Sequence, residues 1–297
     1  MSSPKVTVLI TSYNQEDFIG PALESVIGQD YENLEILACD DGSTDGTLEV
    51  LRQLSERDAR VKVIATDHNT GVAENRNRGL RARTGELLAL LDGDDLMRPR
   101  KIAAQVELLE AHPEAVGCLH DAEVFNSADG AKLGLFSRTL GSRLHNGGAE
   151  LWLDPTYMVL PSTVMLRSCS IADRLCDPRI PFTCEWLLFI EVFRQGSCIV
   201  LDGVYVDYRR HGEQMSADNA TTGFEESMMV MTLVDCRYPE LASHTRTMRA
   251  ALLYGEARRR LRSGDRRGAL GFVRSAARTG GLAGHVRLVG RVASARR

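Results

Sequence analysis

Apolar and amphipathic segments alternate along the first 112 residues of the chain. Four short apolar runs bounded by polar turns predict buried strands at Lys5–Ile10, Leu34–Cys39, Val61–Ala65 and Glu86–Leu91. The segments that follow them carry apolar residues at helical spacing and predict helices at Asp17–Ile27, around Leu48 to Leu54, at Val72–Arg83 and at Pro99–His112. Strands that are repeatedly followed by helices, with short connections, are typical of a parallel sheet covered by helices on both faces. The first half of the chain is therefore predicted to be an α/β unit.

The second half is less regular and ends in helices. Short strands are predicted at Val116–Leu119, Thr163–Leu166, Ile199–Leu201 and Val204–Tyr208, with a helix near Glu185–Arg194. Beyond Ala220 the pattern is helical, and Ala250–Leu261 and Arg266–Ala277 form a predicted helical hairpin. We expect an α/β domain over residues 1–218, divided at about residue 115, and a basic helical extension over residues 219–297.

Two acidic clusters follow predicted strands. Asp40-Asp41-Gly42 ends the second strand, and Asp92-Gly93-Asp94-Asp95 ends the fourth. In open α/β sheets, ligands bind outside the carboxyl ends of the strands. Mg²⁺ or Mn²⁺, held by carboxylates and substrate phosphates, would neutralise the second cluster; the alternative is a solvated acidic turn that caps the next helix. The first cluster is not an EF-hand calcium loop, because the twelfth position counted from Asp41 is Arg52 instead of Glu.

Charge is distributed unevenly along the chain. The net charge is −4, yet Thr245 to Arg297 holds 14 Arg against Glu256 and Asp265, which gives this segment +12 and leaves −16 for the rest. Seven cysteines occur without a C-x-x-C pair, so we expect a reducing compartment and neither a zinc site nor a disulfide framework. No signal-peptide pattern is present, and the apolar runs are shorter than the roughly 20 residues that a membrane helix needs. These features predict a cytoplasmic protein, or one bound peripherally to the inner face of a membrane.

The end of the first predicted strand lacks the glycines of common phosphate-binding loops. It reads Thr11-Ser12-Tyr13-Asn14, with no G-x-G-x-x-G after this strand and no G-x-x-x-x-G-K-[ST] anywhere in the chain. This argues against dinucleotide and Walker-type sites. The hydroxyls and the aromatic ring suit a nucleobase instead.

Four ordered motifs resemble the family 2 glycosyltransferases of the GT-A fold. They are V-T-V-L-I-T-S-Y-N, S-V-I-G-Q-D-Y-E-N-L-E-I-L-A-C-D-D-G-S-T-D-G-T, N-T-G-V-A-E-N-R-N-R-G and L-L-D-G-D-D. The resemblance covers Lys5 to about Glu110 and resumes at Cys184-Glu185-Trp186 and Tyr208-Arg209-Arg210-His211. It implies a Rossmann-like nucleotide-binding fold with a mixed, mainly parallel sheet flanked by helices. Residues 1–115 would bind the nucleotide sugar, and residues 116–218 would form the acceptor side of the catalytic domain.

The resemblance also implies which residues bind the nucleotide. Thr11, Tyr13 and Asp41 would line the nucleoside pocket, where Asp41 accepts a hydrogen bond from a pyrimidine ring. Arg76 or Arg78 lies where the family keeps a basic residue near the nucleotide, although either one also suits a solvated helix face. The pyrimidine contact favours UDP or dTDP donors.

The remaining implied roles belong to acidic residues and one histidine. Asp92 would approach the ribose or the donor sugar, Asp94 would bind Mn²⁺ or Mg²⁺, and Asp95 would contact a sugar hydroxyl or a group around the metal. Glu185 stands at the position of the catalytic base, and His211 would contact the metal or the diphosphate. In the family the base is usually Asp in an acidic pair; in this chain the residue before Glu185 is Cys184.

The implied reaction transfers a sugar from a nucleoside-diphosphate donor to an acceptor hydroxyl, with inversion at the anomeric carbon. The acceptor would be a glycan, a lipid-linked glycan or a peptide, in polysaccharide or glycoconjugate biosynthesis. A sugar-1-phosphate nucleotidyltransferase would need a glycine-rich loop, which Thr11–Asn14 does not supply. A non-catalytic nucleotide-sugar-binding protein is the other alternative, and only Cys184 favours it.

The basic extension admits two interpretations. An amphipathic helix resting on anionic lipid is one, in which arginines accompany Leu252, Leu253 and Leu261. The other is a hairpin that packs on the catalytic domain or on a second subunit, with its arginines in solvent. We favour packing, because three residues would give the second helix a buried face: Leu270, Phe272 and Val273. Nucleic-acid binding is not expected, because the rest of the chain is acidic and the extension has few aromatic residues for stacking.

Overall fold

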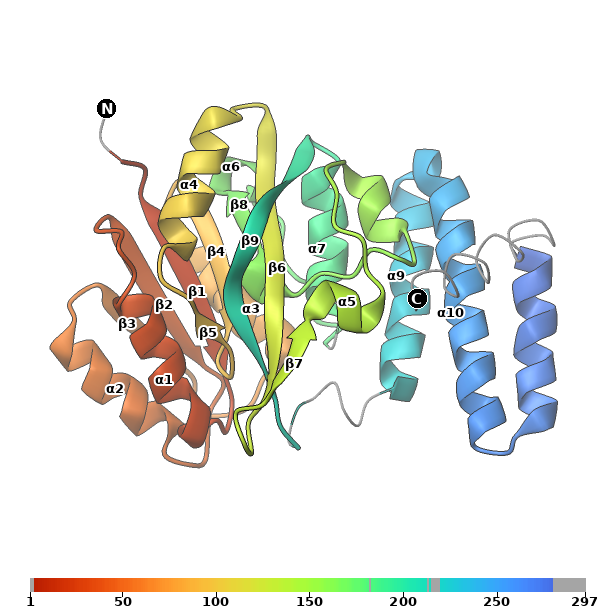
Figure 1. The fold of residues 1–297 in the computed structure, drawn as a ribbon, viewed down its shortest axis with the longest axis horizontal. Helices are drawn as coiled ribbons and strands as arrows, with labels where there is room; N and C mark the ends of the chain where they lie inside the picture. The colour runs from red at the N-terminus through yellow and green to blue at the C-terminus, as the bar shows by residue number, and fades with distance from the viewer. Residues whose placement is uncertain (1–2, 182, 213, 215–219, 280–297) are drawn as a thin grey trace.

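Helices cover both faces of a nine-stranded sheet in the computed structural model of the chain (Figure 1). The structure describes residues 3–181, 183–212, 214 and 220–279. The strand order is β3-β2-β1-β4-β8-β6-β9-β5, and β7 pairs with β6 outside this path. The strands are β1 (Val6–Ser12), β2 (Leu34–Asp40), β3 (Val61–Ala65), β4 (Leu87–Asp92), β5 (Leu96–Met97), β6 (Ala115–Asn126), β7 (Lys132–Leu135), β8 (Met165–Arg167) and β9 (Ser197–Arg210).

The sheet is parallel in its first half and mixed in its second. Strands β3, β2, β1 and β4 are all parallel, β8 runs antiparallel to both β4 and β6, and β9 runs parallel to β6. Short β5 pairs antiparallel with β9. This arrangement confirms the predicted mixed, mainly parallel GT-A-type sheet.

Two apolar cores lie on opposite faces of this sheet. Along β1, Val8 and Ile10 belong to the core that contains α1 residue Ile19, whereas Leu9 belongs to the core that contains α3 residue Leu80. A strand buried on both faces does not alternate between apolar and polar residues, which is why apolar residues occupy successive positions from Val8 to Ile10 of β1. The helices are α1 (Glu16–Ile27), α2 (Thr47–Arg57), α3 (Val72–Ala82), α4 (Lys101–Ala111), α5 (Phe136–Leu140), α6 (Ser168–Ile171) and α7 (Cys184–Phe193), with 3-10 turns η1 (Ala149–Leu153), η2 (Pro161–Thr163) and η3 (Pro239–Leu241).

Two strands of the second half, β6 and β9, are longer than predicted. Strand β6 runs on to Asn126, and β9 is continuous where two separate strands were expected. Polar residues such as His120 and Glu123 interrupt the apolar signal of β6, but the backbone pairing of β6 with β9 does not depend on side-chain hydrophobicity. Irregular register in this pair and the positive φ of Gly203 (121°) accommodate the break in the apolar pattern of β9.

The C-terminal helices stand at one end of the sheet (Figure 1). They are α9 (Ala220–Arg237), α10 (Ala242–Arg262) and a last helix over residues 266–279. The predicted buried face of the last helix is wrong for Leu270 and Val273, which are 50% and 37% exposed. The buried residues of that helix are the small Ala269 and Ala276, and the third predicted residue, Phe272, is partly buried and packs on Phe224 of α9 with ring centroids 5.7 Å apart. Within the described ranges, no helix combines the length and the apolar character needed to cross a bilayer.

Candidate active site

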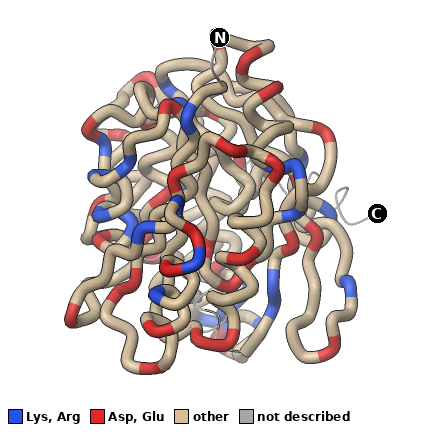
Figure 2. Tube along the Cα trace, turned by 90° about the vertical axis from the view of Figure 1, so that its left-hand side faces the viewer, with Lys and Arg blue, Asp and Glu red and all other residues tan. Residues whose placement is uncertain are grey.

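Strands β1, β2 and β4 end beside one another, and their ends bring the two acidic clusters together. In the sheet register, Thr11 pairs with Asp92 and Ser12 with Asp40. Figure 2 shows Asp and Glu recurring in the loops along the lower edge of the molecule, which is the edge where these strands end in Figure 1. The prediction that both clusters lie at one edge of the sheet is confirmed.

Glycine at position 93 allows the loop after β4 to lie against the end of β1. The Gly93 N–H donates to the Thr11 carbonyl oxygen at 3.0 Å. A Cβ atom at position 93 would lie 2.9 Å from that oxygen and closer still to the side chain of Gln15. A larger residue therefore has no room here. The hydrogen bond from Gly93 holds the backbone that carries Asp92 and Asp94 against the end of β1.

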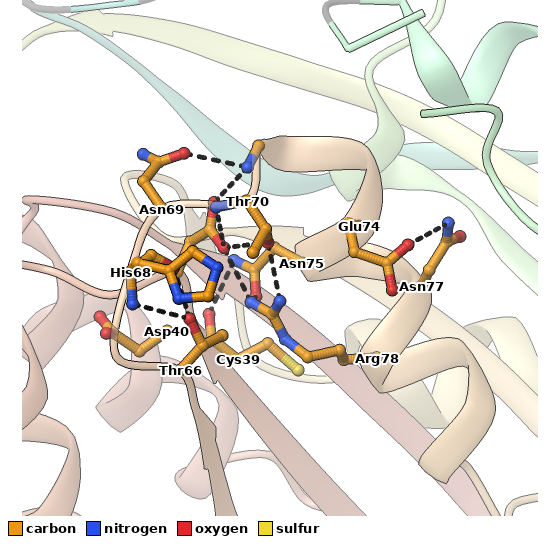
Figure 3. A network of polar contacts seen from close by, with 12 residues as sticks. Cys39, Asp40, Thr66, His68, Asn69, Thr70, Glu74, Asn75, Asn77 and Arg78 are labelled. Atoms are coloured by element: carbon orange, nitrogen blue, oxygen red, sulfur yellow. Dashed lines mark hydrogen bonds and ion pairs between the residues drawn. The ribbon is translucent and has the colours of Figure 1, made fainter. Parts of the chain in front are cut away.

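The Asp41 carboxylate is buried and holds the loop between β3 and α3. It accepts hydrogen bonds from the Thr70 hydroxyl at 2.6 Å and the Gly71 N–H at 2.7 Å, and it pairs with the Arg78 guanidinium at 2.8 Å. Figure 3 shows Arg78 and Thr70 directed toward each other, with Arg78 also donating to Asn75. Hydrogen-bond donors within the chain therefore already occupy much of the hydrogen-bonding capacity of the Asp41 carboxylate. Its contact with a pyrimidine stays a prediction.

Tyr13 is the most exposed of the predicted nucleotide-binding residues, at 41%. The next residue, Asn14, has a positive φ of 49°, a conformation that Asn tolerates better than most residues. Its N–H donates to the Ser43 hydroxyl at 2.9 Å, and its side-chain oxygen accepts from the Thr44 N–H at 2.8 Å. The backbone beside Tyr13 is thus fixed, while its ring is open to a ligand. Thr11 is 8% exposed, and its hydroxyl accepts from Arg76 at 3.2 Å.

Arg76 joins the end of β4 to the start of α7. Its guanidinium forms ion pairs with Asp92, at 2.7 Å, and with Glu185, and only 3% of its side chain is exposed. Burial alone would lower the pKa of Arg76, but the adjacent Asp92 carboxylate raises it above its ordinary value. Arg76 therefore remains a cation that holds the candidate base beside the candidate donor site.

Asp94 and His211 meet although they lie 117 residues apart in the sequence. The Asp94 Oδ2 and His211 Nε2 atoms are 3.0 Å apart, and the imidazole packs on the Phe18 ring with centroids at 4.4 Å. The His211 Nδ1 atom is buried without a hydrogen-bond partner in the described structure. The predicted metal ligands are thus adjacent.

The pair suits a hard cation that also binds substrate oxygens. No group of three or more His, Cys, Asp or Glu side chains suited to a metal is found among the described residues. Mg²⁺ and related ions need only one or two carboxylates when substrate phosphates complete the coordination. A carboxylate, an imidazole with an unpartnered nitrogen and an adjoining donor edge therefore fit such an ion.

Asp95 is turned into the protein, where it links three segments. Its carboxylate accepts from the Ser162 hydroxyl at 2.7 Å and from the Arg209 N–H at 3.1 Å, and the residue is 1% exposed. Burial, and then the nearby charges of Asp94 and Asp92, raise the pKa of Asp95 well above its ordinary value. The structure places Asp95 behind the site, where it positions β9 and η2 relative to β4.

Two residues that build this site were not among the residues predicted from the sequence. The Arg209 guanidinium donates to the Asp94 carbonyl oxygen at 2.8 Å and lies against the Phe18 and Phe125 rings. Asn75 donates to the carbonyl oxygens of Ser12 and Cys39, and so ties the ends of β1 and β2 together. The motif around His211 contained the signal for Arg209, and the motif N-T-G-V-A-E-N-R-N-R-G contained Asn75 without distinguishing it from its polar neighbours.

Several known proteins with similar sequences are described as glycosyltransferases. The family model described as Glycosyl transferase family 2 matches residues 7–175. An uncharacterized glycosyltransferase of Haemophilus influenzae is 30% identical over 222 residues, covering 72% of this chain and 68% of that protein. The putative glycosyltransferase EpsE and the putative teichuronic acid biosynthesis glycosyltransferase TuaG, both of Bacillus subtilis, are 41% and 37% identical over 37% and 36% of this chain. Those matches span 40% of EpsE and 42% of TuaG.

Solved structures show the same fold at low sequence identity. S. aureus TarS, residues 1–349, in complex with UDP-GlcNAc, aligns with a TM-score of 0.65 at 20% identity, covering 84% of this chain and 72% of that one. The mannosyltransferase PcManGT from Pyrobaculum calidifontis, in complex with GDP-Man and Mn²⁺, aligns with a TM-score of 0.64 at 19% identity, covering 100% and 81%. The family model matches more than half of the residues of this chain, and the chain therefore belongs to glycosyl transferase family 2.

Proposed function

We propose that this glycosyltransferase moves a sugar from a UDP or dTDP donor to an acceptor hydroxyl, with inversion and with a divalent metal. The observation that carries the proposal is the placement of Glu185 and Asp92 on one buried guanidinium, that of Arg76. This arrangement supports a role for Glu185 as proton acceptor beside the end of β4, where the resemblance to the family implies that the donor binds. Residues 1–218 would form the catalytic domain, and residues 219–297 an extension.

Asp94 and His211 are the residues that would hold the metal. When bound there, Mn²⁺ or Mg²⁺ offsets the negative charge of a departing diphosphate. The Mn²⁺ in the PcManGT complex supports this choice of metal. Arg209 would keep the Asp94 backbone in place, because it donates to the Asp94 carbonyl oxygen.

Glu185 would be the general base. The acceptor hydroxyl gives its proton to the Glu185 carboxylate while its oxygen attacks the anomeric carbon, and the bond from that carbon to the diphosphate oxygen breaks on the opposite face. One displacement of this kind inverts the anomeric configuration. General-base assistance typically contributes about 10²–10⁴-fold to such a step. Arg76, which forms an ion pair with Glu185, would hold this carboxylate in position for the acceptor hydroxyl.

The edge of the sheet would bind the nucleoside. Tyr13 offers an exposed ring, Thr11 a hydroxyl and Arg78 a cation beside Asp41. The UDP-GlcNAc complex of TarS supports a uridine donor, and the GDP-Man complex of PcManGT shows that the fold also binds a purine nucleotide. A polysaccharide, lipid-linked glycan or peptide hydroxyl would be the acceptor, and the name of TuaG supports polysaccharide biosynthesis.

A panel of nucleotide sugars with Mn²⁺ tests this proposal. Donor hydrolysis, and transfer to candidate acceptors, would be measured for the wild type and for Glu185→Gln. The variant is expected to bind the nucleotide but to lose transfer by about 10²-fold or more, because the amide cannot accept the proton. Glu191→Gln is the matched control, since Glu191 lies on the same helix and pairs with Arg237 at 2.6 Å, away from the site.

The alternative, a non-catalytic nucleotide-sugar-binding protein, predicts another result. Cys184 stands beside Glu185 where the family has an acid, and a binder would retain the fold without turnover. Nucleotide binding without hydrolysis or transfer of any donor in the panel would favour that alternative. Equal transfer rates for the wild type and Glu185→Gln would instead remove Glu185 from the mechanism.

A further inference from the structure

The last two helices expose apolar side chains among arginines. Leu261, Leu270 and Val273 are 58%, 50% and 37% exposed. Single exposed leucines are common on proteins, but these three belong to a segment that is strongly basic. The hairpin face is defined here by six residues: Leu261, Arg262, Arg267, Leu270, Val273 and Arg274.

These residues gather at the turn and along one side of the last helix. Arg267, Leu270 and Arg274 are spaced by three and four residues, so they form one stripe on that helix. The stripe points away from Ala269 and Ala276, which are buried against the neighbouring helices. Leu261 and Arg262 end α10 directly before the turn at 263–265, close to Arg267 in the chain.

The acidic residues of this region are engaged by other arginines. Glu256 pairs with Arg259 and Arg260, and Asp265 pairs with Arg260. Asp235 on α9 pairs with Arg249. In the part of the chain that the structure describes, no ion pair or hydrogen bond involves the side chains of Arg262, Arg267 or Arg274. The hairpin face is therefore a cationic surface that the described residues do not neutralise.

We propose that the hairpin face docks on an anionic phospholipid surface. Guanidinium groups bind phosphate through paired hydrogen bonds, and isolated leucines between them can enter the boundary between headgroups and acyl chains. A protein partner is less suited, because the apolar residues are separated by arginines and form no continuous patch. The rest of the chain carries −16 and is repelled by the same lipids, so contact is confined to the hairpin at the end of the molecule (Figure 1).

Vesicle flotation of the full chain tests this docking. Phosphatidylcholine vesicles, with and without phosphatidylglycerol, would be used at low and high salt. The protein is expected to float with the phosphatidylglycerol vesicles alone and to be released by salt. The double variant Arg267→Glu/Arg274→Glu should bind at least about tenfold more weakly, since each basic residue near an anionic surface strengthens binding severalfold. Leu270→Ser should weaken binding at both salt concentrations.

A charge-matched control separates the hairpin face from net charge. Arg52→Glu/Arg57→Glu makes the same charge change at exposed positions of α2 and should leave flotation unchanged. Thermal melting checks that each variant is folded. The proposal is overturned if the wild type does not float, or if both double variants bind equally. It is also overturned if sedimentation shows that Arg267→Glu/Arg274→Glu dissociates a dimer without changing lipid binding. None of these results depends on sugar transfer.

Discussion

Arg76 on α3 forms a buried ion pair with Glu185, the second residue of α7. The same guanidinium also pairs with Asp92 at the end of β4, so one cation bridges two carboxylates that come from different elements. Two carboxylates gathered in a buried position would repel each other without it. The position of Glu185 therefore depends on an arginine as much as on the helix that carries it.

Replacing Arg76 with Lys should reduce the rate of transfer more than donor binding. A lysine ammonium is a point charge without the planar fork that bridges two carboxylates. We expect kcat for transfer to fall by about 10²-fold, because small displacements of a catalytic group have effects of this size. Steady-state kinetics with varied donor would measure kcat and KM separately. If only the donor KM rises, Arg76 serves the nucleotide and does not position Glu185.

Removing the Asp94 carboxylate should weaken metal binding. For Asp94→Asn, the Mn²⁺ concentration that gives half-maximal activity is expected to rise at least about tenfold, because an amide is a poorer ligand than a carboxylate for a hard cation. Titration of Mn²⁺ into the protein with UDP present gives a second measurement. Asp129→Asn, in the loop between β6 and β7, is the control. An unchanged Mn²⁺ requirement in Asp94→Asn would place the metal elsewhere.

Alanine at position 93 should destabilise the fold and the site together. A Cβ atom there would lie 2.9 Å from the Thr11 carbonyl oxygen, so the loop or the end of β1 must move. Overpacking of this kind costs about 1–3 kcal/mol of unfolding free energy. Urea unfolding measures the loss. Gly255→Ala in α10 is the control, since nothing lies within 4 Å of the added carbon, and it should stabilise the helix by about 0.5–1 kcal/mol.

Lys101 should make stability depend on pH above neutrality. Burial lowers its pKa from 10.5 to about 7, and its ammonium donates to the Gln105 side chain at 2.9 Å. Between these two values the unfolded chain binds a proton at Lys101 that the folded chain does not, so this residue makes stability rise with pH. Lys101→Met removes that dependence and should be more stable than the wild type at pH 7. The amount by which the unfolding free energy of Lys101→Met exceeds that of the wild type should shrink by roughly 2 kcal/mol between pH 7 and pH 9.

Denaturant unfolding at both pH values measures this difference. Lys132→Met is the control, because Lys132 is exposed and pairs with Glu123 at the surface. Parallel stability curves for the wild type and Lys101→Met would show that Lys101 keeps an ordinary pKa in the folded protein.

The C-terminal extension shows how a correct helix prediction can assign the wrong face. Helical spacing located the last helix but placed Leu270 and Val273 in the core, because apolar residues usually turn inward. The structure buries Ala269 and Ala276 there, while Phe272 packs on Phe224 of α9. Which side of a short helix is buried depends on the segments that pack against it, and the spacing of apolar residues along the helix does not identify those segments.

Local pattern determined the alternation of strands and helices and the position of acidic residues at strand ends. This is so because periodicity and turn chemistry act over a few residues. The pairings that define the site were decided only by tertiary structure. Arg76 meets Glu185, and Asp94 meets His211 across 117 residues, because α7 and β9 return to the edge where β4 ends. Contacts between distant segments depend on the order and register of the sheet, which no single segment encodes.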